Sequence, residues 1–170
     1  MTTAIPKNIK EVTHSWLSEI LGGEVTGFDT TYLEGGVLSD VFKIRSIEYA
    51  DNSSRLPPSI GLKIANERKE QRAVAMSNSA YVREIRFYKE LADAVPLRTP
   101  IIYSALEDGS KSCEFFSIAM EDLNTHSDVF DQINDPPNES YIRKINLEVA
   151  AFHAKFWEAD TLKLDWLRCP

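Results

Sequence analysis

The sequence predicts an α+β fold in which one long helix packs on a mostly antiparallel sheet of about five strands. Short runs that alternate apolar and polar residues recur along the first 120 residues, as β-strands do. Gly-Gly and Asp-Gly steps separate neighbouring runs, which is typical of hairpins. A single amphipathic segment, 80–94, separates the third run from the fourth. A parallel sheet would need such a helix at every connection, so the pattern favours antiparallel pairing.

The first predicted elements are a short helix and a hairpin. Thr13 can cap a helix that reaches residue 21, and Gly22 and Gly23 then end it. Its apolar face comprises Trp16, Leu17, Ile20 and Leu21. Two strand-like runs, 25–33 and 37–48, follow it. Because only Glu34-Gly35-Gly36 joins them, we expect them to pair as a hairpin.

A third strand and a long helix are predicted next. A polar loop over 50–58 leads to the run at 59–65, where Lys63 alternates with apolar residues. The polar segment 67–79 is compatible with helix or loop. Residues 80–94 are expected to be helical, ending before Pro96. One face of this helix would carry Ala80, Glu84, Phe87, Tyr88 and Leu91.

Two further strands and a second long helix complete the prediction. Runs at 101–106 and 113–120 flank an Asp108-Gly109 turn signal. A Pro-containing loop then leads to a helix from about residue 140. The apolar stripe of this helix consists of Ile142, Ile145, Val149, Phe152 and Phe156. If the helices that should cover this stripe are missing, it would be exposed.

Composition excludes several classes of function. The 170 residues carry a formal net charge of −7 with scattered Lys and Arg, so no nucleic-acid partner is expected. The sequence contains neither an apolar run of membrane-spanning length nor a secretory signal, so we expect no membrane partner. Cys113 and Cys169 lie far apart without metal-ligand spacing. We therefore expect two reduced thiols, no metal site and a cytoplasmic location.

Three features could carry chemistry, and each has an ordinary structural alternative. The Gly35-Gly36 turn, followed by Ser39, could let backbone N–H groups approach a phosphate, although such turns are more often structural. Lys63 could sit on the solvated face of the sheet, and spacing alone favours that interpretation. Glu84 interrupts an apolar helix face and could pair within its own helix. Alternatively, Glu84 could pair with Lys63 across the sheet–helix interface and orient it.

The order of these features resembles a known family. The segments that carry the resemblance are YLEGGVLSDVFKI, IGLKIA, YVREIRFYKEL, FFSIAMEDL and EVAAFHAKFW, between residues 16 and 166. Together they resemble the aminoglycoside phosphotransferase and choline kinase-like superfamily, most closely its ecdysteroid kinase-like (CHK) branch. The resemblance implies a protein kinase-like fold with an N-lobe over 1–120 and a hinge and linker over 121–139. Residues 140–170 would then begin a helical C-lobe.

The resemblance also implies roles for individual residues. Gly35, Gly36 and Ser39 match the loop that covers the nucleotide phosphates. Lys63 matches the lysine that contacts them, and Glu84 matches the glutamate that holds this lysine. The hinge, whose backbone would receive adenine, matches Met120, Glu121, Asp122 and Leu123. ATP with Mg²⁺ would be the cofactor and a small-molecule hydroxyl compound the acceptor.

The sequence departs from the family at the catalytic loop. The family's His-Gly-Asp, its later Asn and its magnesium-binding Asp should follow the helix that contains His153, which we interpret as a packing or hydrogen-bonding residue. His126-Ser127-Asp128 fits only superficially, because Ile133 stands where Asn is required. We therefore expect no catalytic residue and no metal ligand in this chain, which would be truncated. It would transfer no phosphate alone and bind nucleotide weakly at best.

Two other interpretations stay open at this point. The chain could be a non-catalytic half-kinase that acts as a binding or interaction module. It could also be an unrelated α+β binding domain in which Lys63 and Glu84 are surface residues.

Overall fold

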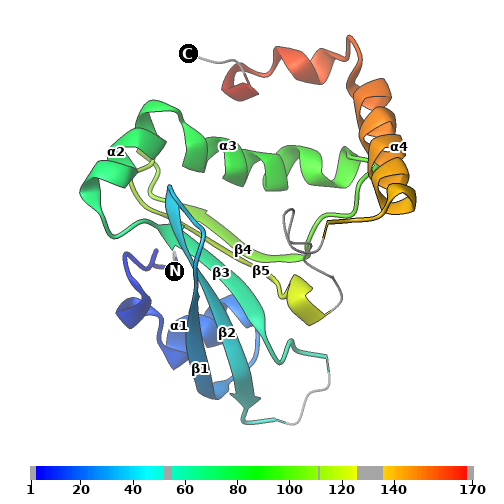
Figure 1. Ribbon diagram of the computed structural model, residues 1–170. Coiled ribbons are helices and arrows are strands. Elements are labelled where there is room, and N and C mark those ends of the chain that lie inside the picture. The colour runs from blue at the N-terminus through cyan, green and yellow to red at the C-terminus, as the bar shows by residue number, and fades with distance from the viewer. Residues whose placement is uncertain (1–2, 52–54, 111, 126–135, 168–170) are drawn as a thin grey trace.

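Five strands form one antiparallel sheet in the computed structural model, which describes residues 3–51, 55–110, 112–125 and 136–167. The strands lie in the order β1-β2-β3-β5-β4, and all four neighbouring pairs are antiparallel. Their bounds are β1 Val25–Leu33, β2 Ser39–Tyr49, β3 Ile60–Ala65, β4 Ile102–Glu107 and β5 Phe116–Glu121. The predicted α+β class and five-stranded antiparallel sheet are therefore confirmed (Figure 1).

One face of the sheet is covered by α1, His14–Leu21. The hydroxyl of Thr13 caps this helix by accepting a hydrogen bond from the N–H of Trp16, and Gly22 ends it with a φ of 74°. The buried side chains of α1 join apolar side chains from β2 and β3 in one core cluster. These strand residues are Phe42, Ile44, Ile47, Ile60, Leu62 and Ile64.

The opposite face of the sheet is covered by α3, Ala80–Arg86 (Figure 1). A π-helical turn, Phe87–Leu91, and a short 3-10 turn, Ala92–Ala94, continue it, so the helical prediction for 80–94 is confirmed. The buried side chains are Tyr81, Ile85, Leu91 and Ala92, whereas the predicted face is only partly buried apart from Leu91. The difference begins before the π turn: Tyr81 and Ile85 have the same four-residue spacing as Ala80 and Glu84, so helical periodicity alone does not choose between the two faces. The segment that the sequence left undecided contains another helix, α2, Lys69–Ser77.

The β1–β2 turn has local reasons for both of its glycines. Gly35 adopts a φ of 115°, a conformation that other residues rarely accept. A Cβ on Gly36 would lie 2.2 Å from the carbonyl oxygen of Ser39, so only glycine fits without a shift of the backbone. The glycines are therefore required by the turn itself, with or without a phosphate nearby.

The turn between β4 and β5 shortens the second of the two predicted strands. Asp108 accepts hydrogen bonds from the backbone N–H groups of Ser110 and Phe115, and Gly109 has a φ of 72°. Cys113, which is buried, also has a positive φ of 48°. Because this conformation is incompatible with a strand, β5 begins at Phe116 and not at residue 113.

Tyr81 connects α3 to the residue just before β2 and to the residue just after β3. Its hydroxyl donates a hydrogen bond to the carbonyl of Leu38, at the end of the β1–β2 turn, and accepts one from the N–H of Asn66, just after β3. Its ring stacks on Phe116 with centroids 4.2 Å apart. Burial raises the pKa of Tyr81, so the hydroxyl keeps its proton and remains a donor. One side chain thus fixes the turn and the end of β3 against α3.

Removing this hydroxyl should lower stability. We expect Tyr81→Phe to reduce the free energy of unfolding by about 1–2 kcal/mol, because the partly buried carbonyl of Leu38 and the buried N–H of Asn66 would lose their partner. Urea unfolding followed by circular dichroism measures the change. Tyr32→Phe is the matched control, since the Tyr32 ring is 49% exposed and its hydroxyl lies 3.5 Å from Asp40. An equal effect of the two substitutions would contradict the assigned role.

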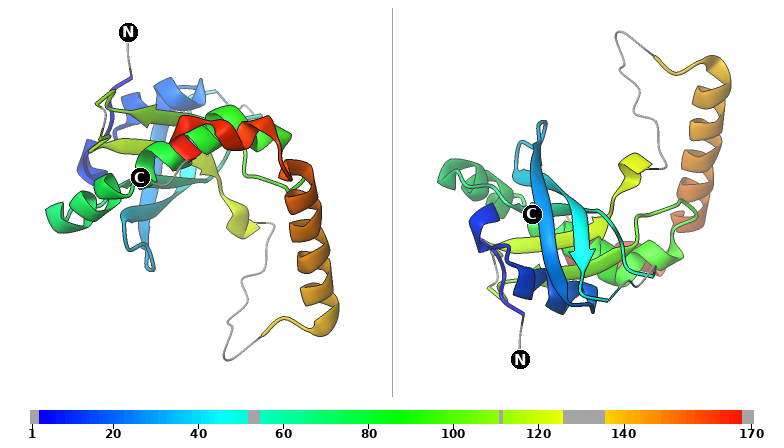
Figure 2. Two further views of the ribbon diagram at one scale, coloured as in Figure 1. Left: turned by 90° about the horizontal axis from the view of Figure 1, so that it is seen from above. Right: turned by 90° about the horizontal axis from the view of Figure 1, so that it is seen from below.

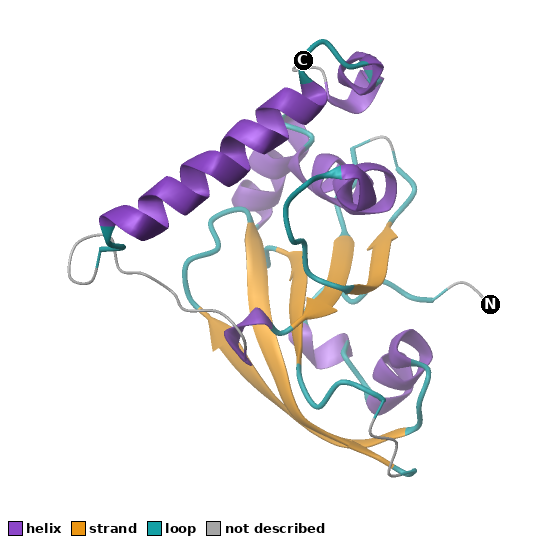
Figure 3. Cartoon of the chain, turned by 90° about the vertical axis from the view of Figure 1, so that its right-hand side faces the viewer, coloured by secondary structure: helices purple, strands orange, loops and turns teal. Residues whose placement is uncertain are grey.

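The second long helix, α4, spans Glu139–Phe156 and begins at the capping residue Asn138. It lies on the outside of the molecule, as Figure 3 shows, and none of its residues is buried. Ile142, Ile145 and Val149 are 47%, 48% and 40% exposed. The expected exposure of the apolar stripe is therefore observed along these three side chains. His153, which we expected to pack or to hydrogen-bond, is also exposed.

This exposed stripe should bind a hydrophobic dye. We expect the protein to enhance the fluorescence of ANS and the double variant I142E/I145E to do so much less. The free energy of unfolding should change by less than about 0.5 kcal/mol, because neither side chain belongs to the core. Ala151→Glu, at an exposed position on the same helix away from the stripe, is the control and should leave the fluorescence unchanged. Wild-type protein without ANS binding would contradict the exposure of the stripe.

The chain after α4 returns to α3. Short 3-10 turns at Asp160–Lys163 and Asp165–Leu167 lie over α3, as Figure 2 shows from above. The indole N–H of Trp166 donates a hydrogen bond of 2.8 Å to the Glu90 carboxylate. None of the described helices is long and apolar enough to cross a membrane. Cys169 and the His126-Ser127-Asp128 triplet lie outside the described residues.

Candidate functional site

Lys63 and Glu84 form an ion pair between β3 and α3. The Lys63 ammonium lies 2.7 Å from both carboxylate oxygens of Glu84, so one cation holds the carboxylate at both atoms. The two side chains are 26% and 27% exposed. The pairing predicted across the sheet–helix interface is therefore confirmed, and the alternative that Lys63 lies on a solvated face of the sheet is wrong, because α3 covers this face.

Strand alternation explains how the two side chains meet. Lys63 lies opposite Val41 on β2 and Ile118 on β5, and successive strand residues point to opposite faces. Its neighbours Leu62 and Ile64 point toward α1, so Lys63 points toward α3. Glu84 lies next to the buried Ile85 in the chain. The buried Tyr81 lies one turn before it, and the partly buried Tyr88 lies one turn after it. Burial, together with the charge of Glu84, raises the pKa of Tyr88.

The predicted phosphate loop lies beyond one end of this face. Ser39, which opens β2, pairs with Ala65 two residues along from Lys63, so their side chains share the α3 face. Ser39 is only 5% exposed, which leaves its hydroxyl little accessible surface. The Gly35-Gly36 turn extends beyond it. The structure thus places the turn and Lys63 on neighbouring parts of one surface.

The predicted hinge lies at the other end of β5. Met120 pairs with Gly61 on β3 and shares the Lys63 face, whereas Glu121 points to the opposite face. The Glu121 carboxylate accepts hydrogen bonds from Arg98 and from the N–H of Ile101. The side chain of Glu121 therefore binds the segment just before β4.

Asp122, in the predicted hinge, contacts Lys43 on β2 and Ser59 just before β3. Its carboxylate lies 2.8 Å from the Lys43 ammonium and accepts a hydrogen bond of 2.7 Å from the Ser59 hydroxyl. The N–H of Asn124 donates to its second oxygen, and Leu123 begins a 3-10 turn. Burial by itself would raise the pKa of Asp122, but the bonds from Lys43 and Ser59 outweigh it and hold the pKa below its ordinary value of 3.8. The side chains of Glu121 and Asp122 therefore have structural partners, and the backbone of Met120 and Glu121 pairs with β3 on one side and with β4 and Ile101 on the other.

The Asp122 network should make stability depend on acid pH. Because the folded-state pKa is depressed, the contribution of Asp122 is fully present above its unfolded pKa and is lost as pH falls through the folded value. We expect the free energy of unfolding to decrease as the pH is lowered from about 4. The decrease should be smaller in the Asp122→Asn variant than in wild type. Urea unfolding between pH 2.5 and 6 measures this difference, with Asp51→Asn as the control at an exposed aspartate. Parallel curves for wild type and Asp122→Asn would contradict the assignment.

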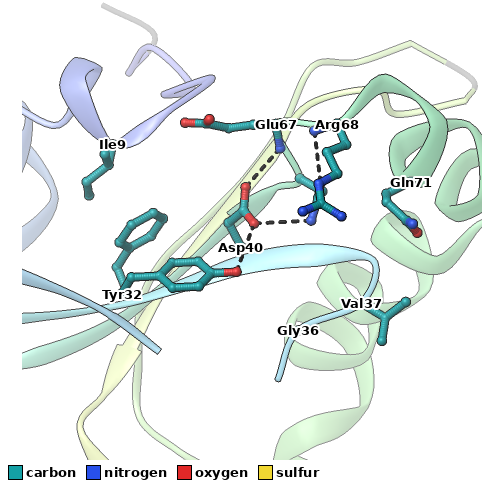
Figure 4. A pocket seen from close by; sticks show the side chains of 10 residues that line it. Ile9, Tyr32, Gly36, Val37, Asp40, Glu67, Arg68 and Gln71 are labelled. Carbon is teal, nitrogen blue, oxygen red and sulfur yellow. Dashed lines mark hydrogen bonds between the residues drawn. The ribbon is translucent and has the colours of Figure 1, made fainter. Parts of the chain in front are cut away.

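Sequence reasoning missed a second polar centre, on the opposite face of the sheet. Asp40 is 8% exposed and pairs with Ile64, so it points toward the α1 side. It accepts hydrogen bonds from the Asn66 amide and from the N–H of Glu67, and it lies beside a cavity of about 690 Å³. Figure 4 shows this cavity. The sequence offered one signal for it, an aspartate placed in the strand directly after the Gly-Gly turn.

Neither a metal centre nor a known relative adds to this picture. No cluster of three or more His, Cys, Asp or Glu side chains that could hold a metal ion occurs among the described residues. The chain matches no model of a known protein family, and no curated protein matches its sequence.

Proposed function

We propose that this chain binds ATP as the nucleotide-side lobe of a kinase that phosphorylates a hydroxyl group on a small molecule. The observation that carries the proposal is the Lys63–Glu84 pair, with 2.7 Å contacts to both carboxylate oxygens. In protein kinases a lysine of the third strand contacts the phosphates and is held by a glutamate of the following helix. Here the lysine lies on β3 and the glutamate on α3.

The remaining parts of the predicted site are compatible with a bound nucleotide. The Lys63 face of the sheet runs from the Gly35-Gly36 turn, past Lys63, to Met120 and the hinge. Phosphates near the turn and adenine near the hinge would follow this direction. Gly61, opposite Met120, has no side chain that would obstruct a flat ring. Phosphoryl transfer relies on positioning and charge stabilisation, and Lys63 would supply part of the charge.

Lys63 should discriminate between ATP and adenosine. We expect Lys63→Met to weaken ATP binding at least about tenfold, because the phosphates lose their cation, and to leave adenosine affinity within about twofold. Isothermal titration calorimetry on the folded variants measures both affinities. Lys89→Met is the matched control, since Lys89 forms an exposed pair with Glu107. Unchanged ATP affinity in Lys63→Met would refute the proposed phosphate contact.

A binding or interaction module is a second candidate, and one observation favours it. The apolar side chains of α4 lie on the outside of the described structure, where they could meet another protein. A partner that binds equally well to Lys63→Met and to wild type, with no dependence on ATP, would support this candidate over the kinase proposal.

A further inference from the structure

Asp40 is a buried carboxylate at the wall of a cavity, and none of the described residues gives it a cationic partner. The Asn66 amide donates to Oδ1 at 3.1 Å and the Glu67 N–H to Oδ2 at 2.8 Å. The Tyr32 hydroxyl lies 3.5 Å from Oδ1. All three donors are neutral. Buried carboxylates are ordinarily paired with a cation, so the partner of Asp40 is to be sought in the cavity.

One acceptor position on Asp40 remains open toward a ligand. A carboxylate oxygen can accept two hydrogen bonds. Within the described structure, Oδ1 already has two donors, whereas Oδ2 has the Glu67 N–H alone. A ligand N–H could therefore donate a second hydrogen bond to Oδ2 without displacing the hydrogen bonds that connect β2 to the residues just after β3.

The cavity has the size and the walls of a small-molecule site. Its volume of about 690 Å³ falls inside the range of about 300–1,000 Å³ that ligand pockets occupy. Ile9, Tyr32 and Phe42 supply apolar walls. The rings of Tyr32 and Phe42 lie at 66° to each other with their centroids 5.3 Å apart, and together they form an aromatic corner of the cavity wall. Aromatic rings attract cations placed over their faces.

The charges around the cavity are divided between its two sides. In Figure 4 the Glu67 carboxylate extends toward Ile9 and Tyr32, whereas Arg68 and Gln71 lie on the other side. Arg68 makes no ion pair with Asp40 in this arrangement, and Glu67 has no ion-pair partner among the described residues. Two carboxylates and the aromatic corner thus lie together on one side.

We infer that this cavity binds an organic ammonium compound with an apolar or aromatic body. The ammonium donates a hydrogen bond to Asp40 Oδ2 and lies within the field of Glu67, and its apolar part packs against Tyr32 and Phe42. Gly36, part of the predicted phosphate loop, also lines this cavity. The inference uses neither Lys63 nor Glu84, because Asp40 and Lys63 point to opposite faces of the sheet. It therefore does not rest on the kinase proposal.

Paired probes that differ in charge test this site. 2-Phenylethylammonium is titrated into the full chain at pH 7, beside the neutral 2-phenylethanol and the anionic 3-phenylpropionate. Binding is followed by NMR through the Asn66 side-chain amide and the Glu67 N–H. We expect the ammonium to shift both signals with an affinity at least about tenfold above that of the alcohol, and the anion to show no binding. Equal affinity for the ammonium and the alcohol, or binding of neither, would overturn the inference.

Variants locate the ammonium within the cavity. Glu67→Gln keeps the backbone N–H that holds Asp40, and we expect it to weaken ammonium binding several-fold. Glu70→Gln, an exposed position on α2 that does not line the cavity, is the matched control. Asp40→Asn should abolish binding if it folds, and if it does not, Glu67→Gln decides. Equal effects of Glu67→Gln and Glu70→Gln would refute the site, whereas Lys63→Met should leave ammonium affinity unchanged.

Discussion

The antiparallel pairing of β2 with β3 decides where each ionisable side chain of the central sheet lies. Asp40 is opposite Ile64, and Val41 is opposite Lys63. Because successive strand residues point to opposite faces, Asp40 points to the α1 side and Lys63 to the α3 side. A slip of one residue in this register would bury Lys63 among the apolar side chains below α1. The buried Ile60, Leu62 and Ile64 prevent such a slip, because it would turn all three toward the α3 side. The core cluster thus positions both candidate sites.

The Lys63–Glu84 pair shows how core packing supports a charged site. Tyr81 and Ile85 are buried one turn apart on α3, and Glu84 lies between them in the chain at the border of the same surface. The hydrogen bond from Tyr81 to Leu38 fixes α3 against the β1–β2 turn. Glu84 is therefore held where Lys63 reaches it, and the partial exposure of both side chains limits the cost of desolvating them. A nucleotide phosphate could approach Lys63 without first breaking the core.

The sequence predicted most of the elements and favoured the main ion pair only through the order of the motifs, and it did not predict contacts that depend on tertiary geometry. Lys63 and Glu84 could be paired because each interrupts an apolar pattern and an unpaired buried charge is costly. Lys43 and Asp122 sit in patterns that require no explanation, so nothing in the sequence joins them. The buried face of α3 differs from the predicted one because Tyr81 and Ile85 have the same four-residue spacing as Ala80 and Glu84, and spacing alone does not choose between them. The Asp40 cavity depends on a loop, a turn and the N-terminal segment meeting around one carboxylate.

The two faces of the sheet place different electrostatic demands on a ligand. On the α3 face a lysine is already neutralised by a glutamate, so an incoming phosphate must share this cation, and its affinity depends on further positive groups. On the α1 face a carboxylate is stabilised by neutral donors only, so the attraction to an incoming cation would be reduced by the cost of desolvating both charges and not by a cation already paired there. The buried apolar side chains form two core clusters, one on the α1 side of the sheet and one on the α3 side, so Lys63 and Asp40 have different surroundings. Strand alternation alone thus places a lysine on one face of the sheet and a buried carboxylate on the other.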